Sequence, residues 1–520
     1  MSVKAYYFYR DKGLWWKPNG TNPLVLVSKR GRTRLMPVVQ EDMQLTEKCA
    51  VFGIFAASPE AARLSFYGLC ALQHRGQESS GIATSDGEAI HRHAANGLVT
   101  TVYRESDLKR LPGNIAIGHN RYSTSGGHSK RFNQPLYNPT HDFALAHNGN
   151  LPDVTLLKAY LKSRGVPTRN LNDSGMMTAA IGQKLDDGMS IEEAISDCYP
   201  LFTGVFSCTL LTRDKLIAFR DRCGIRPLSI GRLKDGSYVI ASETCALDTV
   251  SATFEREVKP GEMVSIDKNG LTSYQIVKGD QKLDIFEYVY FARPDSNMLG
   301  KSVNTIRLNF GREMATEFPV DADVVIPIPD SAIPAALGFA KASGIPFEMS
   351  LIKNRYIHRT FIRPTAELRE HDLKMKLNPL VESIRGRRIV LVDDSIVRGT
   401  TMRKVVAMMR EAGATEVHLL ISCPPILYPD YYGINTPDQA ELIAANMSIT
   451  EIRDYVGATS LHFLSYDGMI RATGLPERTF SASCFTGYYP ISIGKRAAEI
   501  RDINYREYAE THLDVPVTTP

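Results

Sequence analysis

The alternation of apolar and polar positions divides the chain into two parts of different texture. From Cys49 to about residue 278, short apolar segments of strand length, such as Val205–Leu211 and Tyr238–Ala241, are separated by polar turns. Three amphipathic helices are predicted in this part. One runs from Ser58-Pro59 towards Gln73, and another begins at Ser190, which forms a capping box with Glu193. The third begins at Pro152-Asp153 and has an apolar stripe of Leu156, Leu157, Tyr160 and Leu161. These features predict a layered α+β domain.

From about residue 286, strand-like and helix-like segments alternate. The apolar runs Asp323–Ile328, Arg388–Val392 and Glu416–Ile421 are typical of buried strands, and helices are predicted over Ala332–Lys341 and Thr401–Gly413. This alternation predicts an α/β domain with a parallel sheet, which binds ligands at the carboxyl ends of its strands. We therefore predict a leader over residues 1–48, a first domain over 49–282, a second domain over 283–490 and a helical tail over 491–520.

The basic charge of the chain is confined to the leader. The formal net charge is +4, but residues 1–48 alone have nine Lys/Arg against four Asp/Glu, so the remainder is close to neutral. The leader shows no sustained helical or strand period, which favours a solvated tail over a nucleic-acid-binding arm or a transit signal. Met36 and Met43 are alternative start sites.

The composition is that of a globular protein, with 43% hydrophobic and 23% charged residues. Eight cysteines in 520 residues are too few for a disulfide scaffold and are typical of a reducing compartment. No apolar run approaches the ~18 residues of a membrane span. We therefore predict a cytoplasmic protein without a membrane partner.

The strongest chemical signal is Ile389–Thr401, where a buried strand delivers two acidic residues to a loop that enters a helix. Asp393 and Asp394 can bind sugar hydroxyls or a hydrated Mg²⁺, and Gly399 allows close backbone approach to a phosphate. The first amides of a helix are unpaired and bind anions. A plain strand-to-helix turn, with Asp394 or Ser395 as a cap, is the alternative.

This segment resembles the phosphoribosylpyrophosphate (PRPP) loop of type I phosphoribosyltransferases. The resemblance implies that the two acids contact the ribose hydroxyls and that the 5-phosphate lies on the residues that follow, Ser395, Arg398, Gly399, Thr400 and Thr401. Upstream, Pro327–Ser331 ends a strand where the family places its pyrophosphate loop, which implies PRPP contacts from Asp330 and Ser331. The implied cofactor is Mg²⁺, with Ser331, Asp393 and Asp394 as its metal-binding residues.

A basic segment, residues 353–376, lies between these loops and has seven Lys/Arg against three Asp/Glu. Alone it would be a solvated loop, but beside a reaction that releases pyrophosphate it favours a lid whose cations neutralise charge and whose closure excludes water. It resembles the mobile loop of the phosphoribosyltransferase that is fused to a glutaminase. The resemblance implies PRPP contacts from Lys353, Arg355, Tyr356 and Arg359.

In the first domain, Cys49 is followed by four polar segments, at residues 73–78, 118–124, 147–150 and 172–174. Their order and spacing resemble class II glutamine amidotransferases, which implies the N-terminal-nucleophile αββα sandwich. In that class the matching residues are the nucleophile Cys49, the oxyanion-hole residues Asn148 and Gly149, and the glutamine-binding residues Arg75, Arg121, Thr124 and Asp173. Taken alone, these residues also fit a core cysteine, a turn, a surface salt bridge and a helix cap.

The chemistry requires a free amino terminus at Cys49. Glutamine's amide is a poor electrophile, so a thiolate must attack it, and the α-amino group (pKa ~8) can serve as the base for a thiol on the same residue. The Lys48-Cys49 peptide bond occupies that nitrogen in the written sequence. We therefore predict that the leader is removed.

Both halves in this order resemble the glutamine PRPP amidotransferase family over about residues 49–490. The resemblance implies that ammonia from glutamine crosses an internal channel to C1 of PRPP, giving 5-phosphoribosylamine, glutamate and pyrophosphate in the first step of purine biosynthesis. It also implies purine nucleotide inhibitors and a homo-oligomer, a tetramer in relatives. Many relatives carry an iron-sulfur cluster on four cysteines. Here the matching positions read Asp284, Asp430, Arg478 and Ser481, so we predict no cluster.

Three other functions stay open from the sequence. The first is a non-catalytic regulatory paralogue, and the second is a PRPP-sensing nucleic-acid binder that uses the basic leader. The third is a different glutamine amidotransferase, such as a sugar-phosphate aminating enzyme, which would lack the PRPP loop. No repeated basic-aromatic pattern supports the nucleic-acid binder, so no nucleic-acid partner is expected.

Overall fold

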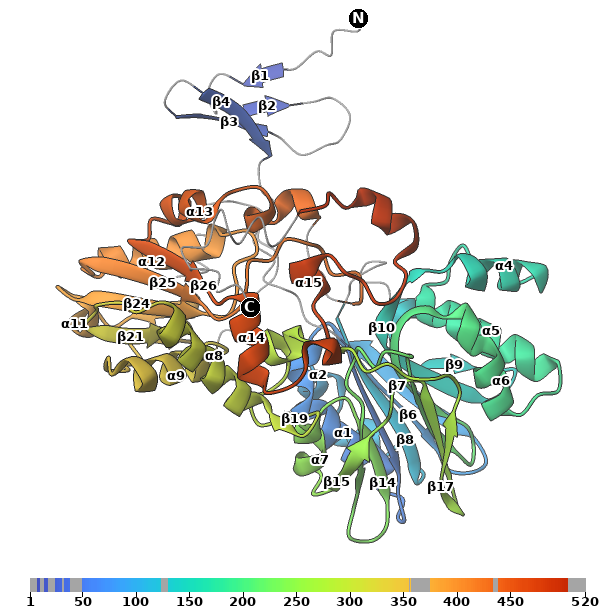
Figure 1. The fold of residues 1–520 in the computed structure, drawn as a ribbon. Coiled ribbons are helices and arrows are strands. Elements are labelled where there is room, and N and C mark those ends of the chain that lie inside the picture. Colours follow the sequence, from blue (N-terminus) through green and yellow to red (C-terminus); the bar gives the residue numbers. More distant parts are fainter. Residues whose placement is uncertain are drawn as a thin grey trace, which may run out of the picture.

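The computed structural model describes residues 49–122, 130–354, 356, 375–433 and 438–503, together with the backbone of four strands in the leader. Figure 1 shows two domains side by side, the first coloured blue to green and the second yellow to red. Within the described residues, no helix has the length and apolar character needed to cross a membrane.

Two antiparallel sheets form the centre of the first domain. The seven-stranded sheet has the order β15-β13-β14-β5-β8-β6-β7, with β5 (Ala50–Phe55), β6 (Ser79–Ser85), β7 (Ile90–Asn96), β8 (Ile115–Arg121), β13 (Ser229–Arg232), β14 (Tyr238–Ala241) and β15 (Thr253–Glu257). The six-stranded sheet has the order β17-β16-β12-β11-β10-β9, with β9 (Leu136–Asn138), β10 (Phe143–Asp153), β11 (Thr203–Leu211), β12 (Leu216–Arg220), β16 (Glu262–Asp267) and β17 (Gly270–Gln275).

Alternate side chains of these strands face two different cores, because successive residues of a strand point to opposite faces. In β5, Phe52 and Ile54 pack with a helical layer, whereas Val51 lies between the sheets. In β10, Leu145 packs with the opposite helical layer, whereas Ala144 lies between the sheets. The layers contain α1 (Ala61–Ala71) and α7 (Thr244–Thr249) on one side, and α4 (Thr155–Ser163), α5 (Asp173–Asp186) and α6 (Ile191–Cys198) on the other. The predicted αββα sandwich is confirmed.

A four-stranded parallel sheet forms the second domain, in the order β21-β24-β25-β26. Its strands are β21 (Val324–Pro327), β24 (Arg388–Asp393), β25 (Glu416–Ile421) and β26 (Ser460–Phe463). Figure 1 shows α12 (Thr400–Glu411) and α13 (Ile449–Val456) on one face, and α8 (Val303–Glu317) and α9 (Ile333–Ser343) on the other. A hairpin of β22 (Leu351–Lys353) and β23 (Leu377–Pro379) precedes β24, and α14 (Tyr466–Thr473) packs on α8. The predicted α/β domain is confirmed.

The two domains share a small apolar core. Val205 and Ile225 of the first domain pack with Tyr432, Ile491 and Ile493. The connection passes through β18 (Leu283–Asp284), which pairs in parallel with β27 (Phe480–Ser481), and a π-helical turn, Glu287–Phe291. The largest buried cluster begins at Leu283 and extends to Phe485. Beyond it, the described part of the predicted helical tail contains the 3-10 helix Gly494–Glu499.

Local predictions for two helices need correction. The first helix begins at Ala61, because Ser58-Pro59 lies in a bend and Glu60 is the cap residue. In α4, Leu157 and Leu161 are buried but Leu156 is 56% exposed. Leu156 lies about 100° around the helix from Leu157, so it points away from the core.

The leader contains an antiparallel sheet that the sequence analysis did not predict. The strands β1 (Tyr7–Tyr9), β2 (Leu14–Trp16), β3 (Leu24–Lys29) and β4 (Arg32–Pro37) pair in chain order. Only Arg30 and Gly31 separate β3 from β4 in the sequence, and this two-residue spacing with glycine is a hairpin signal that a search for longer periods overlooks.

Candidate functional site

Cys49 directly precedes β5, a central strand of the seven-stranded sheet. Its thiol donates a hydrogen bond to the Tyr122 carbonyl, with 3.7 Å between sulfur and oxygen. Burial raises the pKa of the Cys49 thiol to about 11; Arg121 favours the thiolate, and Asp173 opposes it. A thiol with this pKa is protonated at neutral pH, so a nucleophilic role requires a base.

The predicted oxyanion-hole residues lie on β10, which packs against β5 and β8. Asn148 is 1% exposed, and neither its amide nitrogen nor its amide oxygen has a hydrogen-bond partner within the described structure. A buried amide without a partner is costly, so this side chain suits a ligand oxygen. Gly149 has φ +152°, and a Cβ there would lie 2.0 Å from the Val205 carbonyl oxygen. Only glycine fits this position.

Arg121 and Asp173 approach the same site from different elements. Arg121 is the last residue of β8 and is buried. The same strand contacts β10 through His119, whose ring nitrogen lies 3.1 Å from the His147 carbonyl oxygen. Asp173 is the first residue of α5, where its carboxylate accepts hydrogen bonds from the Ser174 amide at 2.8 Å and the Leu151 amide at 3.3 Å. Since both charges act on the Cys49 thiol, the structure brings them together with it. Thr124 lies outside the described residues.

Arg75 is buried in a network of ion pairs near the junction of the domains. Its guanidinium is 1% exposed and forms ion pairs with Glu243 and Glu287, whose side chains are fully buried. Glu287 belongs to the segment that leads into the second domain, so Arg75 connects the domains. A direct contact with glutamine stays a prediction that these ion pairs disfavour.

The phosphate loop of the second domain connects β24 to α12. Gly399 caps the helix in the left-handed conformation, with φ +78°, and a Cβ there would lie 2.7 Å from Ile443 Cδ1. Thr400 and Thr401 form the first turn, so the unpaired amides of the helix lie at the carboxyl end of a central strand. This is the geometry of an anion site.

Asp393 and Asp394 lie at the same strand end as Ser331. Ser331 donates a hydrogen bond to Asp394, and Ser395 donates another to the second oxygen of that carboxylate at 2.7 Å. Burial and the neighbouring carboxylate raise the pKa of Asp393 well above its usual value, and burial raises the pKa of Asp394. Two adjacent acids with raised pKa values favour a cation beside them.

The donor set fits Mg²⁺, which binds oxygen ligands and commonly uses one or two carboxylates together with substrate phosphates. Among the described residues, no group of three or more His, Cys, Asp and Glu side chains is arranged to hold a metal alone. A magnesium ion here would therefore be held jointly by Ser331, the two acids and the phosphates of a substrate.

The two predicted cations that the structure describes, Arg398 and Lys353, have acidic partners. Arg398 is buried and forms an ion pair with Glu441, a residue that the sequence did not indicate. Lys353 Nζ lies 2.6 Å from Asp330 Oδ2, which joins two predicted PRPP residues. Tyr356 is 95% exposed. Arg355 and Arg359 lie outside the described residues, as does most of the predicted lid.

Sequence reasoning also missed Arg307. It lies on α8, is 2% exposed, and donates to the Tyr288 carbonyl at 2.7 Å and to the Ala292 carbonyl at 2.9 Å. Burial lowers the pKa of Arg307 to about 10, and its charge favours the ionised form of Asp394. No local sequence signal marks it, because it lies in an ordinary helix far from the phosphate loop in the chain.

Three of the four positions that would match cluster cysteines, Asp284, Asp430 and Ser481, are buried. The fully buried Arg226 lies between the acids, 2.9 Å from Asp284 Oδ2 and 4.0 Å from Asp430 Oδ1. Carboxylates paired with an arginine do not fit an iron-sulfur cluster, which is held by thiolates.

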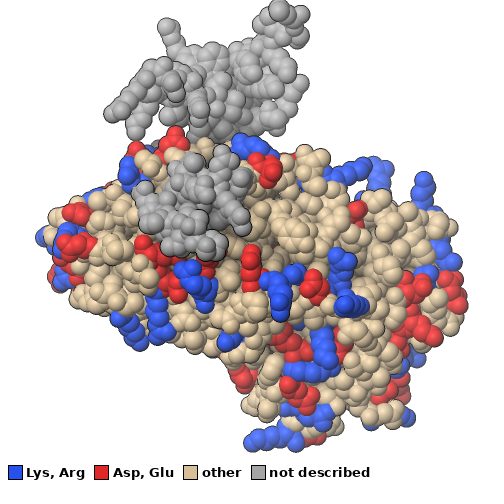
Figure 2. All heavy atoms as spheres, in the orientation of Figure 1, with Lys and Arg blue, Asp and Glu red and all other residues tan. Residues whose placement is uncertain are grey.

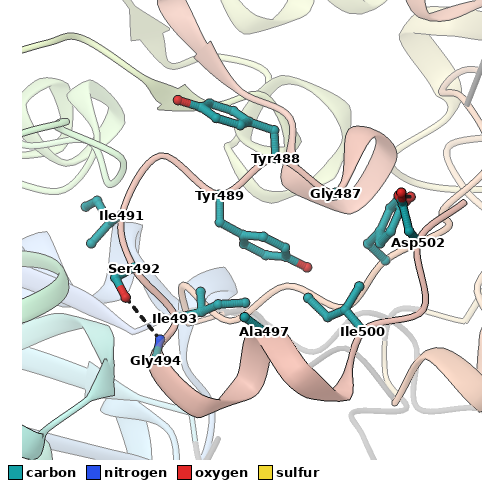
Figure 3. Close-up of a pocket in the computed structure, with 11 residues that line it drawn as sticks. Gly487, Tyr488, Tyr489, Ile491, Ser492, Ile493, Gly494, Ala497, Ile500 and Asp502 are labelled. Carbon is teal, nitrogen blue, oxygen red and sulfur yellow. Dashed lines mark hydrogen bonds between the residues drawn. The ribbon is translucent and has the colours of Figure 1, made fainter. Parts of the chain in front are cut away.

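A cavity of about 420 Å³ lies beside this region, lined by aromatic and aliphatic side chains that include Tyr428, Tyr488, Tyr489, Ile491, Ile493 and Ile500. Figure 3 shows the ring of Tyr489 extending into it, and the Gly494 amide bonded to the Ser492 hydroxyl at 3.2 Å. None of the residues predicted for either centre lines it.

Two family models match the chain in the order of its domains. A glutamine amidotransferase domain matches residues 119–249, and a phosphoribosyl transferase domain matches residues 307–430. An amidophosphoribosyltransferase of Synechocystis is 48% identical over 453 residues, covering 86% of this chain and 92% of that protein. One of Bacillus subtilis is 45% identical over 457 residues, covering 86% of this chain and 95% of that protein.

Solved structures show the same similarity. Glutamine PRPP amidotransferase from B. subtilis, complexed with ADP and GMP, matches with a TM-score of 0.80 and 44% identity, covering 86% of this chain and 98% of that one. A structure described as the allosteric regulatory enzyme of purine biosynthesis matches with a TM-score of 0.81 and 43% identity, covering 88% of this chain and all of that one.

Proposed function

The chain belongs to the amidophosphoribosyltransferase family, and from this premise we propose how its two sites divide the reaction. It is a glutamine-dependent enzyme of purine biosynthesis that forms 5-phosphoribosylamine, glutamate and pyrophosphate from glutamine, PRPP and water. The residue assignment rests above all on the buried amide of Asn148, which has no partner in the described structure.

In the first domain, the Cys49 sulfur attacks the side-chain amide carbon of glutamine. The α-amino group exposed by removal of the leader accepts the thiol proton and returns it to the departing ammonia. Asn148 Nδ2 and the Gly149 N–H donate to the oxyanion, while Arg121 holds the α-carboxylate and Asp173 the α-ammonium of the substrate. Water then cleaves the thioester and releases glutamate.

In the second domain, the 5-phosphate lies on the amides and hydroxyls at the start of α12, and Asp393 and Asp394 hold the ribose. Ammonia attacks C1, the bond from C1 to the pyrophosphate oxygen breaks with inversion, and the new amine loses a proton. Mg²⁺ held by Ser331 and the two acids would neutralise the charge of the leaving pyrophosphate. A dry internal path between the sites keeps ammonia unprotonated.

Other properties are proposals of the same kind. Purine nucleotides are proposed as inhibitors, because the B. subtilis relative was solved with ADP and GMP. We also propose a homo-oligomer, a cytoplasmic location and the absence of an iron-sulfur cluster. The cytoplasmic location is supported by the eight cysteines, all of which are described and none of which forms a disulfide. Stoichiometric iron and sulfide in purified protein would contradict the last proposal.

Small-molecule substrates are favoured over nucleic acid. On the face shown in Figure 2, basic and acidic side chains are interspersed over both domains. A nucleic-acid-binding surface gathers its Lys and Arg on one face or along one element, and the described residues on this face show no such gathering.

Replacing Cys49 tests whether glutamine hydrolysis and the reaction at PRPP take place at separate sites. Cys49→Ala should abolish glutamine-dependent formation of phosphoribosylamine, while free ammonia at high pH still supports it, because the second site is intact. Cys70→Ala, which removes another partly buried thiol of the same domain, is the control and should retain both activities. Loss of both activities in Cys49→Ala, or retention of glutamine use, contradicts the assignment.

A further inference from the structure

A turn of the second domain rests on the strand that carries the oxyanion-hole residues. We call Asp430–Gly433 the interdomain turn. The Asn150 side chain donates from Nδ2 to the Tyr431 carbonyl at 2.7 Å. A Cβ built on Gly433 would lie 3.3 Å from the carbonyl carbon of Gly149 and 3.4 Å from its oxygen, so a methyl group there would press against the Gly149 peptide.

The interdomain turn is firmly held. The Tyr432 amide donates to Asp430 Oδ1 at 2.7 Å, the Tyr432 carbonyl accepts from Arg226 at 2.7 Å, and the Tyr432 hydroxyl accepts from the Ile491 amide at 2.9 Å. Tyr432 itself is fully buried. Tyr489, whose ring extends into the cavity of Figure 3, donates its hydroxyl to the Pro429 carbonyl at 2.6 Å. The turn can therefore act as a fixed support for β10.

Strand β10 needs a support at this point, because its pairing with β11 becomes irregular just after Asn150. Asn148, Gly149 and Asn150 pair in register with β11, but the register shifts between Asn150 and Asp153. Gly149 has no side chain and a positive φ, so its peptide has no side-chain packing of its own to add to the pairing with β11. An oxyanion hole stabilises the transition state only when its hydrogen-bond donors are already oriented before the reaction.

We propose that Asn150 is a positioning residue for the glutaminase site. Its amide, fixed to the Tyr431 carbonyl, holds the Gly149 peptide in the orientation that the oxyanion requires. The oxyanion hole is thus completed by a turn from the phosphoribosyltransferase domain. The inference rests on the proposed roles of Cys49, Asn148 and Gly149.

The test compares Asn150→Ala and Asn150→Asp with Asn114→Ala. Asn114 is also half-buried and donates to a carbonyl, that of Ala56 at 3.3 Å, but within the first domain. Loss of one oxyanion donor costs about 100- to 1,000-fold in kcat, so a loosened donor should cost roughly 10- to 100-fold. We expect this fall in kcat for glutamine in Asn150→Ala, with KM changed less than about threefold and ammonia-dependent activity retained.

Asn150→Asp separates the hydrogen bond from simple packing. Aspartate has almost the same shape but presents an oxygen to the Tyr431 carbonyl, so it should be at least as impaired as Asn150→Ala. Near-normal kcat in Asn150→Asp, a kcat in Asn150→Ala within threefold of Asn114→Ala, or an equal loss of the ammonia route overturns the inference.

Gly433→Ala tests the same support from the other domain. It adds a methyl group against Gly149 at a residue with φ +107°, and should lower glutamine-dependent kcat selectively. Gly386→Ala is the control, because Gly386 has φ +75° but no neighbour within 4 Å of the added carbon. This comparison decides the matter if Asn150→Ala does not fold.

Two further variants separate this inference from the proposed function. If Cys49→Ala or Asn148→Ala still uses glutamine, the proposed glutaminase site is wrong, whatever Asn150 does. If both lose glutamine use but Asn150→Ala and Gly433→Ala behave like their controls, only the positioning role fails.

Discussion

Replacing Glu287 by glutamine should destabilise the junction between the domains. Glu287 is fully buried and forms ion pairs with Arg75 and with Arg226, the latter at 3.4 Å. Glutamine keeps the volume and one acceptor oxygen but removes the charge that both guanidinium groups share. The two arginines, which are also buried, would each retain another acid, Glu243 for Arg75 and Asp284 for Arg226.

The magnitude follows from this partial compensation. Removing one partner of a buried ion pair costs about 3–5 kcal/mol. Because each arginine keeps a second carboxylate, we expect the lower end, about 3 kcal/mol. For a domain of 150–250 residues, 1 kcal/mol shifts Tm by about 2–4 °C, so the unfolding transition should move down by about 6–12 °C.

Differential scanning calorimetry of the wild type and the variant measures this shift. The matched control is Glu105→Gln, which breaks a bidentate pair with Arg63 whose side chains are 40% and 53% exposed. An exposed pair contributes at most about 1 kcal/mol, so the control should unfold close to the wild type. If Glu287→Gln unfolds within about 2 °C of Glu105→Gln, the buried network does not stabilise the junction and the reasoning is refuted.

Three other predictions concern maturation, the phosphate site and pH. Intact-mass analysis of the active enzyme should find Cys49 as the first residue, and full activity with Lys48 retained would exclude the α-amino base. Asp393→Asn should reduce both the glutamine- and the ammonia-dependent rates by about 100-fold or more, since both reactions end at C1 of PRPP; loss of the glutamine route alone would contradict the shared site. Burial raises the pKa of Asp284 from 3.8 to about 6, so the folded protein binds this proton more tightly than the unfolded chain does. The protonated carboxyl therefore stabilises the fold at low pH, and this stabilisation is lost as the pH rises through about 6. Glu287→Gln removes a repulsion that raises this pKa, so its unfolding free energy should fall less between pH 4 and 6 than that of the wild type, and equal slopes would refute the coupling.

Local signals in the sequence were sufficient for much of the fold. The capping box of Ser190 and Glu193 is present, and the strands predicted at Tyr238–Ala241 and Glu416–Ile421 have those bounds. The loop at Gly399 leads into a helix as predicted. These features depend on neighbours within a few residues, so the sequence contains the whole interaction.

The sequence predictions failed at one helix start and for the strands of the leader. Ser58-Pro59 has the residues of a helix start, yet the chain bends there and α1 begins at Ala61. The strands of the leader were overlooked because each is only three to six residues long, too short for a period to be recognised.

Short stretches of the sequence identify the chemistry of both sites: a cysteine before a buried strand, an amide-glycine pair, and two acids ahead of a helix start. The partners that these residues take are set when the chain folds. In the folded chain, Arg75 pairs with Glu287, Arg398 pairs with Glu441, and Gly433 lies close to Gly149. Such contacts join residues from 43 to more than 200 positions apart. These contacts depend on how distant segments of the chain pack together. No short window of sequence contains both partners, so local patterns do not predict them.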